Sequence, residues 1–463
     1  MRYMIRQIVE SAKFVDEVRL QALEAAIPYE TLQAVVQDHQ LQRQRKRKLS
    51  AEMGLFLGIC MHIFSSLSLT QVLFKMVQGL RYVWPDPDLR PASKGAISQL
   101  RYQQGARPMV DLFHRVCKPM ATAQTQGAFL GPWRLMGIDG TTECLADTSA
   151  NLHAFGRHAS GYHGDAAFPQ GQVVFLVEIG THAIVDAGIW PVHTTERLGA
   201  KRMLRSVTAE MLVLWDAGMH SFAMIQATLA RQAHFLGAAP TRIRVQRVRR
   251  LPDGSWLVKL FEPAKKRKST SPPLLLRLID YSLSDPALPG YQKKRCLFTS
   301  LLDQQAYPAQ LLANRYHERW EVEMVIDEAD THQRKPSQVF RSKHPVGMLQ
   351  EFYGLLIAHY AIRKIMLDSA HWAEVDSDQI SFTNALRIIQ NAIPEFQQTH
   401  PEQLPGLYQR LLKDIAIFRL PRRENRINPR VIKRQRSRFE KKRPEHRCWP
   451  QPSVPYIDAI VLI

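Results

Sequence analysis

Residues 314–323 constrain this chain most, because three side-chain types with chemical roles recur there at helical spacing. The segment reads Asn-Arg-Tyr-His-Glu-Arg-Trp-Glu-Val-Glu. Tyr316, Arg319 and Glu323 stand at i, i+3 and i+7, and a helix with about 3.6 residues per turn places all three on one stripe. A carboxylate beside an arginine and a tyrosine indicates a site that holds a metal ion and a phosphate together.

The charge balance of the chain indicates a polyanionic partner. Its 463 residues include 62 Lys and Arg against 42 Asp and Glu, which gives a formal net charge of +20. A surplus of this size favours nucleic acid, and a solvated basic surface is the alternative. Half of the surplus lies in residues 419–447, which contain 13 Lys and Arg against 3 Asp and Glu. We interpret this segment as a tail that follows a nucleic-acid backbone, with a solvated tail as the alternative.

Cysteine usage and hydropathy indicate a protein of a reducing compartment with no membrane partner. The five cysteines are dispersed and form no Cys-x-x-Cys pair, which argues against a disulfide framework and against a structural zinc site. The N-terminal residues show no signal-peptide pattern. The most apolar run, Gly54 to Leu69, is shorter than a bilayer span requires, so we predict a buried helix there.

Hydrophobic spacing predicts an α/β fold class and divides the chain into five regions. Residues 1–125 form a helical N-terminal DNA-binding domain, for which a bundle that only packs on the next domain is the alternative. An α/β core follows in two parts, residues 126–239 and 305–395, separated by a β-rich insertion over residues 240–304. Residues 396–463 form a helical and then basic C-terminal segment.

Individual elements follow from the same patterns. The predicted helices span residues 15–26, 29–36, 49–66, 73–80, 94–103, 201–207, 221–236, 309–329 and 345–368, with two more over 380–417. The predicted strands span residues 134–138, 172–179, 183–192 and 211–215, and in the insertion 242–249, 255–261, 274–283 and 295–301. Arg101 is expected on a helix surface, and Asp186 is expected at the surface or in a hairpin.

Two aspartates follow predicted strands of the α/β core. Asp139 comes after Arg134-Leu-Met-Gly-Ile, and Asp216 comes after Met211-Leu-Val-Leu-Trp. Side chains just past strand ends converge when the strands are neighbours, and Glu323 would add a third carboxylate. Three close carboxylates repel one another unless a cation neutralises them, and hard oxygen ligands select Mg²⁺ or Mn²⁺. The acids therefore predict metal-assisted phosphoryl transfer, with two ions roughly 4 Å apart, on DNA or RNA.

Other interpretations of these acids stay open at this point. A single aspartate after a strand is more often a turn or helix-capping residue than a metal ligand. Asp147 and Asp165 are competitors of the first aspartate, and Asp327 lies on the same helical stripe as Glu323.

The ordered motifs resemble the IS4-family DDE transposases of bacterial insertion sequences. The third-acid motif, Tyr316-x2-Arg319-x3-Glu323, carries the resemblance most strongly. The resemblance extends over most of residues 20–440. Its further motifs are Asp139-Gly-Thr with Asp147-Thr-x-x-Asn151, Leu212-Val-Leu-Trp-Asp216-x-Gly218, Phe340-Arg-Ser-Lys343-x-Pro345, and Pro91-Ala-Ser-Lys-Gly-Ala-Ile-Ser-Gln-Leu-Arg101.

The resemblance implies a fold, a reaction and partners. The fold would be an RNase H-like catalytic core with a β-rich insertion, preceded by a helical N-terminal domain. The protein would be a DNA-binding endonuclease of DNA recombination that cuts transposon ends and joins them to target DNA by two-metal-ion phosphoryl transfer. Mg²⁺ would be the cofactor, with Mn²⁺ able to substitute. A homodimer on DNA, in the bacterial cytoplasm and associated with the nucleoid, would carry out transposition.

The resemblance also implies roles for single residues. Asp139, Asp216 and Glu323 would be the catalytic, metal-binding triad. Tyr316 and Arg319 would contact phosphate near the scissile end, since a planar guanidinium matches phosphate oxygens. Trp256, in the insertion, would stack on a flipped base, with a packed strand aromatic as the alternative.

The chain departs from the family pattern at two positions. The family has a lysine seven residues after the glutamate, where this chain has Asp330, and often an arginine where it has Ala217. Arg334 or Lys335 could replace the missing lysine as a DNA contact. These departures leave two alternatives to a working transposase, namely a catalytically decayed DNA-binding protein and an RNase H-like nuclease without strand transfer.

Overall fold

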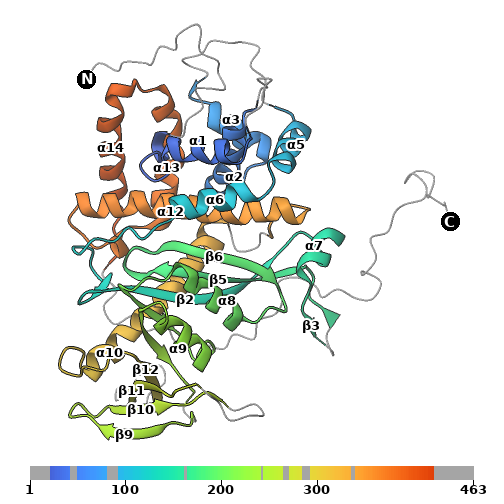
Figure 1. Cartoon of the computed structure of the whole chain (residues 1–463). Coiled ribbons are helices and arrows are strands. Elements are labelled where there is room, and N and C mark those ends of the chain that lie inside the picture. The colour runs from blue at the N-terminus through green and yellow to red at the C-terminus, as the bar shows by residue number, and fades with distance from the viewer. Residues whose placement is uncertain are drawn as a thin grey trace, which may run out of the picture.

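A computed structural model describes residues 21–41, 49–80, 92–160, 164–240, 243–263, 271–283, 292–334 and 339–421. The basic residues from 422 onward and Lys335 lie outside these ranges, so their predicted contacts with DNA have no structural counterpart here. Helices from both ends of the chain form one layer, and a long sheet from the middle of the chain forms the other (Figure 1).

Five strands build the central part of the sheet in the order β6-β5-β2-β7-β8. β5 runs antiparallel to β6 and β2, whereas β2, β7 and β8 are parallel. This order and these directions are those of an RNase H-like fold, so the predicted fold class is confirmed. The strands are β2 (Trp133–Cys144), β5 (Gln170–Glu178), β6 (Ala183–Pro191), β7 (Met211–Trp215) and β8 (His234–Ala238).

The strand-rich segment after β8 extends this same sheet. β12 (Arg295–Thr299) pairs antiparallel with β8, and β11 (Leu274–Tyr281), β10 (Trp256–Leu260) and β9 (Gln246–Arg250) follow outward. Figure 1 shows these strands at the end of the molecule opposite the helical layer. Three minor strands are β1 (Phe129–Leu130), which pairs with β2, and the pair β3 (Ala159–Ser160) and β4 (Gly164–Asp165).

The helical layer joins the two ends of the chain. Its members are α1 (Tyr29–Asp38), α2 (Ala51–Ile63), α3 (Leu69–Val77), α5 (Lys94–Gln104), α6 (Arg107–Val116), α12 (Pro345–Trp372), α13 (Phe382–Gln398) and α14 (Leu404–Ala416). α2 is buried on all sides, as predicted for the apolar run, and it crosses α12 closely. A Cβ added to Gly354 would lie 2.3 Å from the carbonyl oxygen of Gly58, so only glycine permits this approach. Among the described residues, no helix has the length and hydropathy needed to cross a membrane.

The N-terminal helices also attach to α12 through polar contacts. Arg101 donates to the side chain of Gln350 (3.2 Å) and to the carbonyl of Gly347 (3.0 Å). Arg101 therefore lies on the surface of α5, as expected, and this surface faces α12. These helices pack on the core as one layer, and their predicted role in DNA binding stays a prediction. The domain boundaries stay predictions.

Three expectations need correction. The second half of the helix predicted over 221–236 is wrong, because α9 (Phe222–Leu229) ends early and the buried strand β8 follows. Asp186 is fully buried rather than superficial, since Arg205 and Ser206 bond to its carboxylate. The helix predicted from 201 is α8 (Glu196–Met203), which begins five residues earlier. α7 (Ser149–Phe155), which was not predicted, completes this half of the core.

Candidate active site

The register of two neighbouring strands brings the two aspartates together. Asp139 lies inside β2 rather than at its end, contrary to expectation. β2 pairs with β7 only as far as Gly137, which lies opposite Leu214. Asp139 and Asp216 each lie two residues beyond this last pair, along β2 and just past the end of β7. Both side chains therefore lie at the same level of the sheet.

Asp216 also shapes the turn in which it lies. Its Oδ1 accepts hydrogen bonds from the backbone N–H groups of Gly218 (2.9 Å) and Met219 (3.2 Å). This is the turn-capping role expected of an aspartate after a strand. The turn fixes the carboxylate beside Asp139, so capping and site formation are compatible.

The third acid comes from a long, irregular helical segment. α10 (Ala309–Tyr316), a 3₁₀ turn (His317–Arg319), α11 (Trp320–Asp327) and a π-helical turn (Glu328–Gln333) follow without a break. Val322 of α11 packs where Gly137 lacks a side chain, since a Cβ there would lie 2.2 Å from Val322 Cγ2. The bare glycine therefore lets the helix approach β2 and places Glu323 near Asp139.

Arg319 connects the first and third carboxylates. Its guanidinium donates to Asp139 Oδ2 (3.0 Å) and to Glu323 Oε1 (3.2 Å). The arginine is only 6% exposed, whereas the Glu323 side chain keeps 36% of its surface in solvent. A buried guanidinium thus occupies the space between two acids of the predicted triad, with one side of the group open to solvent.

Electrostatics shows that the three carboxylates share one environment. Burial raises the pKa of Asp139 above its ordinary value, Arg319 opposes this, and the charges of Asp216 and Glu323 raise the pKa further. Three interacting acids, of which two bond to one arginine, leave a deficit of positive charge. Carboxylate oxygens are the ligands that Mg²⁺ and Mn²⁺ prefer, so this residue set fits a divalent ion.

Tyr316 lies where α10 meets the end of β7. Its hydroxyl donates to the carbonyl oxygen of Trp215 (3.2 Å), the residue before Asp216. Burial raises the pKa of Tyr316 to about 12, so the hydroxyl stays protonated at neutral pH. The side chain holds the helix against the aspartate turn, and its predicted contact with phosphate stays a prediction.

Trp256 lies on β10 and is half-buried. The guanidinium of Arg247, on β9, covers its ring at 4.7 Å from the ring centroid. A cation over one face does not prevent stacking on the other, so the predicted base contact stays a prediction.

The expected replacement of the family lysine is not supported at Arg334. This side chain is 6% exposed, and its guanidinium bonds to Glu143 (2.6 Å) and Asp330 (3.3 Å) and lies over the ring of Phe340. Burial and the neighbouring Glu143 carboxylate raise the pKa of Asp330 well above its ordinary value. Asp330 therefore belongs to a group with Glu143 on β2, and the guanidinium of Arg334 compensates the acidic charge of this group.

The competing acids whose partners are known pair with basic side chains elsewhere. Asp147 bonds to Arg157 (2.7 Å), and Asp327 lies 3.3 Å from a ring nitrogen of His332. Arg319 instead bonds to Asp139 and Glu323. The geometry therefore favours Glu323 over Asp327 as the third member of the site.

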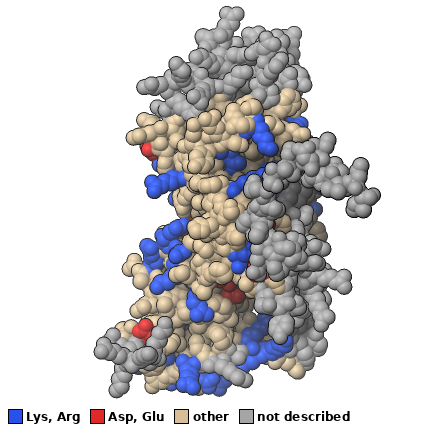
Figure 2. Space-filling view, turned by 90° about the vertical axis from the view of Figure 1, so that its right-hand side faces the viewer, with Lys and Arg blue, Asp and Glu red and all other residues tan. Residues whose placement is uncertain are grey.

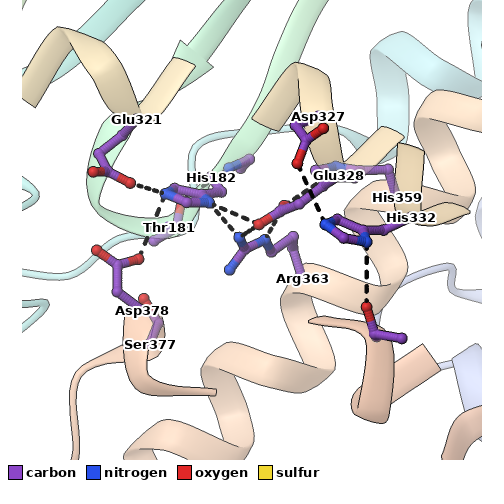
Figure 3. Close-up of polar contacts among 12 residues, drawn as sticks. Thr181, His182, Glu321, Asp327, Glu328, His332, His359, Arg363, Ser377 and Asp378 are labelled. Atoms are coloured by element: carbon purple, nitrogen blue, oxygen red, sulfur yellow. Dashed lines mark hydrogen bonds and ion pairs between the residues drawn. The ribbon is translucent and has the colours of Figure 1, made fainter. Parts of the chain in front are cut away.

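A second polar cluster lies on another side of α11, and sequence reasoning missed it. We call His182, Glu321, Glu328, Arg363 and Asp378 the histidine cluster (Figure 3). His182 stands in the turn between β5 and β6 in a left-handed conformation (φ 59°). One ring nitrogen lies 3.0 Å from Glu321 and 3.5 Å from Asp378, and the other lies 3.3 Å from Glu328.

The histidine cluster compensates its own charges. Burial and Arg363 both lower the pKa of His182, but Asp378, Glu328 and Glu321 outweigh them and raise it to about 9. Glu328 also pairs with Arg363 and contacts His359. One ligand atom each of His182, Glu321 and Asp378 lies within 4.8 Å of the others, a spacing that could hold a metal ion. The imidazolium and the guanidinium already supply positive charge, so we interpret the cluster as a support of α11. Its sequence signal was the seven-residue spacing of Glu321 and Glu328.

Glu196 is a further acid that sequence reasoning missed. It is the first residue of α8, directly after Thr195, whose side chain caps the helix. Its Oε1 lies next to Gly140, the residue after Asp139, and burial and the charges of Asp139 and Asp216 raise its pKa. A Thr-Glu pair before helical spacing is a known start signal, and it would have moved the predicted helix start to include this residue.

Comparisons with known proteins identify the family. The chain matches the model of the insertion element 4 transposase N-terminal domain over residues 17–114 and that of the transposase DDE domain over residues 135–360. It is 26% identical, over 417 residues, to the transposase InsG for insertion sequence element IS4 of Escherichia coli (strain K12), covering 89% of this chain and 88% of the relative. Among solved structures it matches the piggyBac transposase synaptic complex with hairpin DNA, at 13% identity and a TM-score of 0.43, covering 92% of this chain and 89% of the other. The family models and the full-length relative establish that this chain belongs to the IS4 family of DDE transposases.

Proposed function

We propose that this transposase cuts the ends of its insertion sequence and joins them to target DNA, with Asp139, Asp216 and Glu323 as the metal-binding triad. One observation carries the proposal. Three carboxylates from distant segments of the chain share one environment: the Arg319 guanidinium bonds to Asp139 and Glu323, and the charge of Asp216 acts on Asp139. A site with this deficit of positive charge is suited to divalent cations and to the phosphates that accompany them.

The chemistry divides between the ions and the chain. Divalent ions at such a site supply Lewis acidity, which activates the attacking oxygen and stabilises the leaving oxygen. The chain contributes positions: β2 and β7 fix Asp139 and Asp216, and α11 presents Glu323. Arg319 lies between the acids, so its planar fork is placed to bind a scissile phosphate. Tyr316 holds that helix at the end of β7.

The sheet end that carries β9–β12 offers a surface for DNA. Figure 2 shows Lys and Arg side chains gathered at this end of the molecule. Arg249 and Arg250 on β9 and Lys259 on β10 are exposed, and all five residues of β9 face solvent. Phosphate contacts from such a row position a duplex without reading its sequence. We propose that this surface holds transposon-end DNA next to the triad, with Trp256 at its margin.

The identity of the metal ion, the oligomeric state on DNA and the cellular location are part of the same proposal. Mg²⁺ is the expected ion, and Mn²⁺ is expected to substitute because both prefer oxygen ligands. Two element ends must be processed together, so we propose a homodimer on DNA. A cytoplasmic, nucleoid-associated location follows from a bacterial DNA substrate.

The test uses DNA that carries the inverted repeats flanking the gene, with Mg²⁺ present. Asp139→Asn keeps the shape of the side chain and removes one charge, so we expect loss of end cleavage with DNA binding retained. Asp327→Asn is the matched control, since Asp327 pairs with His332 rather than Arg319. Full cleavage by the Asp139 variant would refute the assignment of the triad.

The same assay separates the two alternatives. Wild-type protein that binds the ends tightly but never nicks them in Mg²⁺ or Mn²⁺ would be a decayed DNA-binding protein. Wild-type protein that cuts but never joins the ends to a target plasmid would be a nuclease. Cleavage followed by joining supports the transposase.

A further inference from the structure

Glu196 lies beside the proposed metal site, and no cationic side chain among the described residues pairs with it. It opens α8, and the structure records no ion pair to it among the described residues. Arg197, the next residue, donates to the carbonyl oxygen of Gly218 (3.0 Å), in the turn that Asp216 caps. The first turn of α8 is therefore attached to the loop that carries the second aspartate.

Gly140 shows how closely Glu196 approaches the first aspartate. A Cβ built on Gly140 would lie 2.5 Å from Glu196 Oε1, so the carboxylate fills the space that a side chain would need. The backbone N–H of Gly140 bonds to Asp139 Oδ1 (2.9 Å). The carboxylates of Asp139 and Glu196 therefore meet at the same residue, Gly140.

From these contacts we propose that Glu196 is a fourth carboxylate of the catalytic centre and a ligand of a divalent cation held there. The inference rests on the proposed function of the triad. With Glu196 included, four acids act electrostatically on one another, and Arg319 is bonded to two of them, Asp139 and Glu323. An additional carboxylate from α8 would give a second ion its own ligand, beside the face of Asp139 that Arg319 leaves open.

A purely structural role for Glu196 makes a different prediction. An acid in the first turn of a helix stabilises that end electrostatically, and its side chain fills the space beside Gly140. Glu196→Gln keeps the size of the side chain and the hydrogen-bond acceptor, and removes only the charge. A structural role therefore predicts nearly unchanged metal binding in this variant, whereas a ligand role predicts a large loss.

The experiment measures Mn²⁺ binding to the full chain by calorimetry, and the Mn²⁺ concentration that gives half-maximal end cleavage. For Glu196→Gln we expect metal affinity to fall by about 10- to 100-fold or more, and the half-maximal concentration to rise in parallel. Glu210→Gln is the control, because Glu210 is exposed and directly precedes β7, the strand that leads to Asp216. Wild-type affinity and an unchanged half-maximal concentration in the Glu196 variant would overturn the inference.

Further variants keep this outcome separate from failure of the proposed function. Asp139→Asn should lose both Mn²⁺ binding and cleavage, and if it retains both, the triad itself is misassigned. If Asp139→Asn loses both while Glu196→Gln behaves as wild type, only the inference about Glu196 fails. Should Glu196→Gln unfold in EDTA, Glu196→Asp replaces it, with an affinity expected below that of the wild type and above that of Glu196→Ala. Equal affinities of those two variants would contradict a ligand role.

Discussion

Two groups of acids flank the same helix and differ in how their charges are compensated. In the catalytic group, Arg319 bonds to Asp139 and Glu323, Asp216 acts on Asp139 by its charge, and one side stays open to solvent. In the histidine cluster, the three acids Glu321, Glu328 and Asp378 face the Arg363 guanidinium and the His182 imidazolium, which are both buried. Only the first group leaves a large deficit of positive charge.

The difference explains how one helix serves two purposes. Glu321 and Glu323 are two residues apart on α11, so their side chains point to different sides. Glu321 joins the histidine cluster, whose charges are compensated by side chains of the protein, and this cluster anchors the helix. Glu323 joins the catalytic group, which needs an external cation. The balance between acids and internal cations, rather than the number of acids, therefore separates a candidate metal site from a structural network.

The largest expected effect comes from replacing these two glutamates with glutamine, one at a time. Glu323→Gln should reduce Mg²⁺-dependent cleavage by more than about a hundredfold, since it removes a proposed metal ligand. Glu321→Gln should leave cleavage by the folded protein nearly unchanged and lower the urea midpoint, because His182 loses a partner. Cleavage and urea unfolding are measured on both variants. If the two effects are reversed, the comparison between the groups is wrong.

Removal of the buried guanidinium should cost the most stability. Arg363 is 3% exposed and compensates Glu328, so Arg363→Met leaves a buried carboxylate without its main partner. Breaking a buried pair in this way typically costs roughly 3–5 kcal/mol of unfolding free energy. Urea unfolding at neutral pH measures the loss, and Arg410→Met, at an exposed position, is the control. A loss below that of the control would show that the cluster does not anchor α11.

The pH dependence of stability should reveal the imidazolium. The folded-state pKa of His182 is about 9 against an ordinary value of 6.5, so its contribution is complete below pH 6.5 and is lost as the pH rises through 9. The shift corresponds to a contribution on the order of 3 kcal/mol. The unfolding free energies of wild type and His182→Asn should converge over this window, and asparagine tolerates the left-handed backbone. Asp378, whose pKa is raised to about 6, titrates below the window. Parallel curves from pH 6 to pH 9.5 would contradict an imidazolium at this position.

The smallest effect concerns the arginine of the catalytic group. Without metal, Arg319→Gln should lower the unfolding free energy by about 1–2 kcal/mol, since Asp139 and Glu323 lose a charged donor. Added Mn²⁺ should stabilise this variant more than it stabilises the wild type, because the charge deficit is larger. Thermal unfolding in EDTA and in Mn²⁺ gives both values. An equal Mn²⁺ effect in both proteins would mean that Arg319 does not share the cation site.

Much of the fold followed from local patterns. The strand predicted over 211–215 matches β7, and the paired strands around residue 180 match β5 and β6, because buried strands carry continuous runs of Val, Ile and Leu. β8 was missed because its short sequence, His-Phe-Leu-Gly-Ala, continues a helical apolar spacing from α9. Short apolar segments fit either period until a neighbouring strand pairs with them.

Side-chain partners were harder to predict than strands. Arg334 looked like a free cation for DNA, but Glu143 on β2 lies 191 residues away in sequence and binds it. Likewise, His182 reaches Glu321 only because the β5–β6 turn meets α11. Sequence patterns report on neighbours within one or two turns of a helix, whereas ion pairs across the core depend on how elements pack.

The sequence by itself determined the family, most strands of the core and the three acids of the candidate triad. Those features rest on local spacing and on ordered motifs, which a linear chain carries directly. Tertiary structure alone decided which acids face a deficit of positive charge and which are neutralised internally, and it added Glu196 to the first group. The physical reason is that electrostatic compensation depends on distances between elements, and only packing sets those distances.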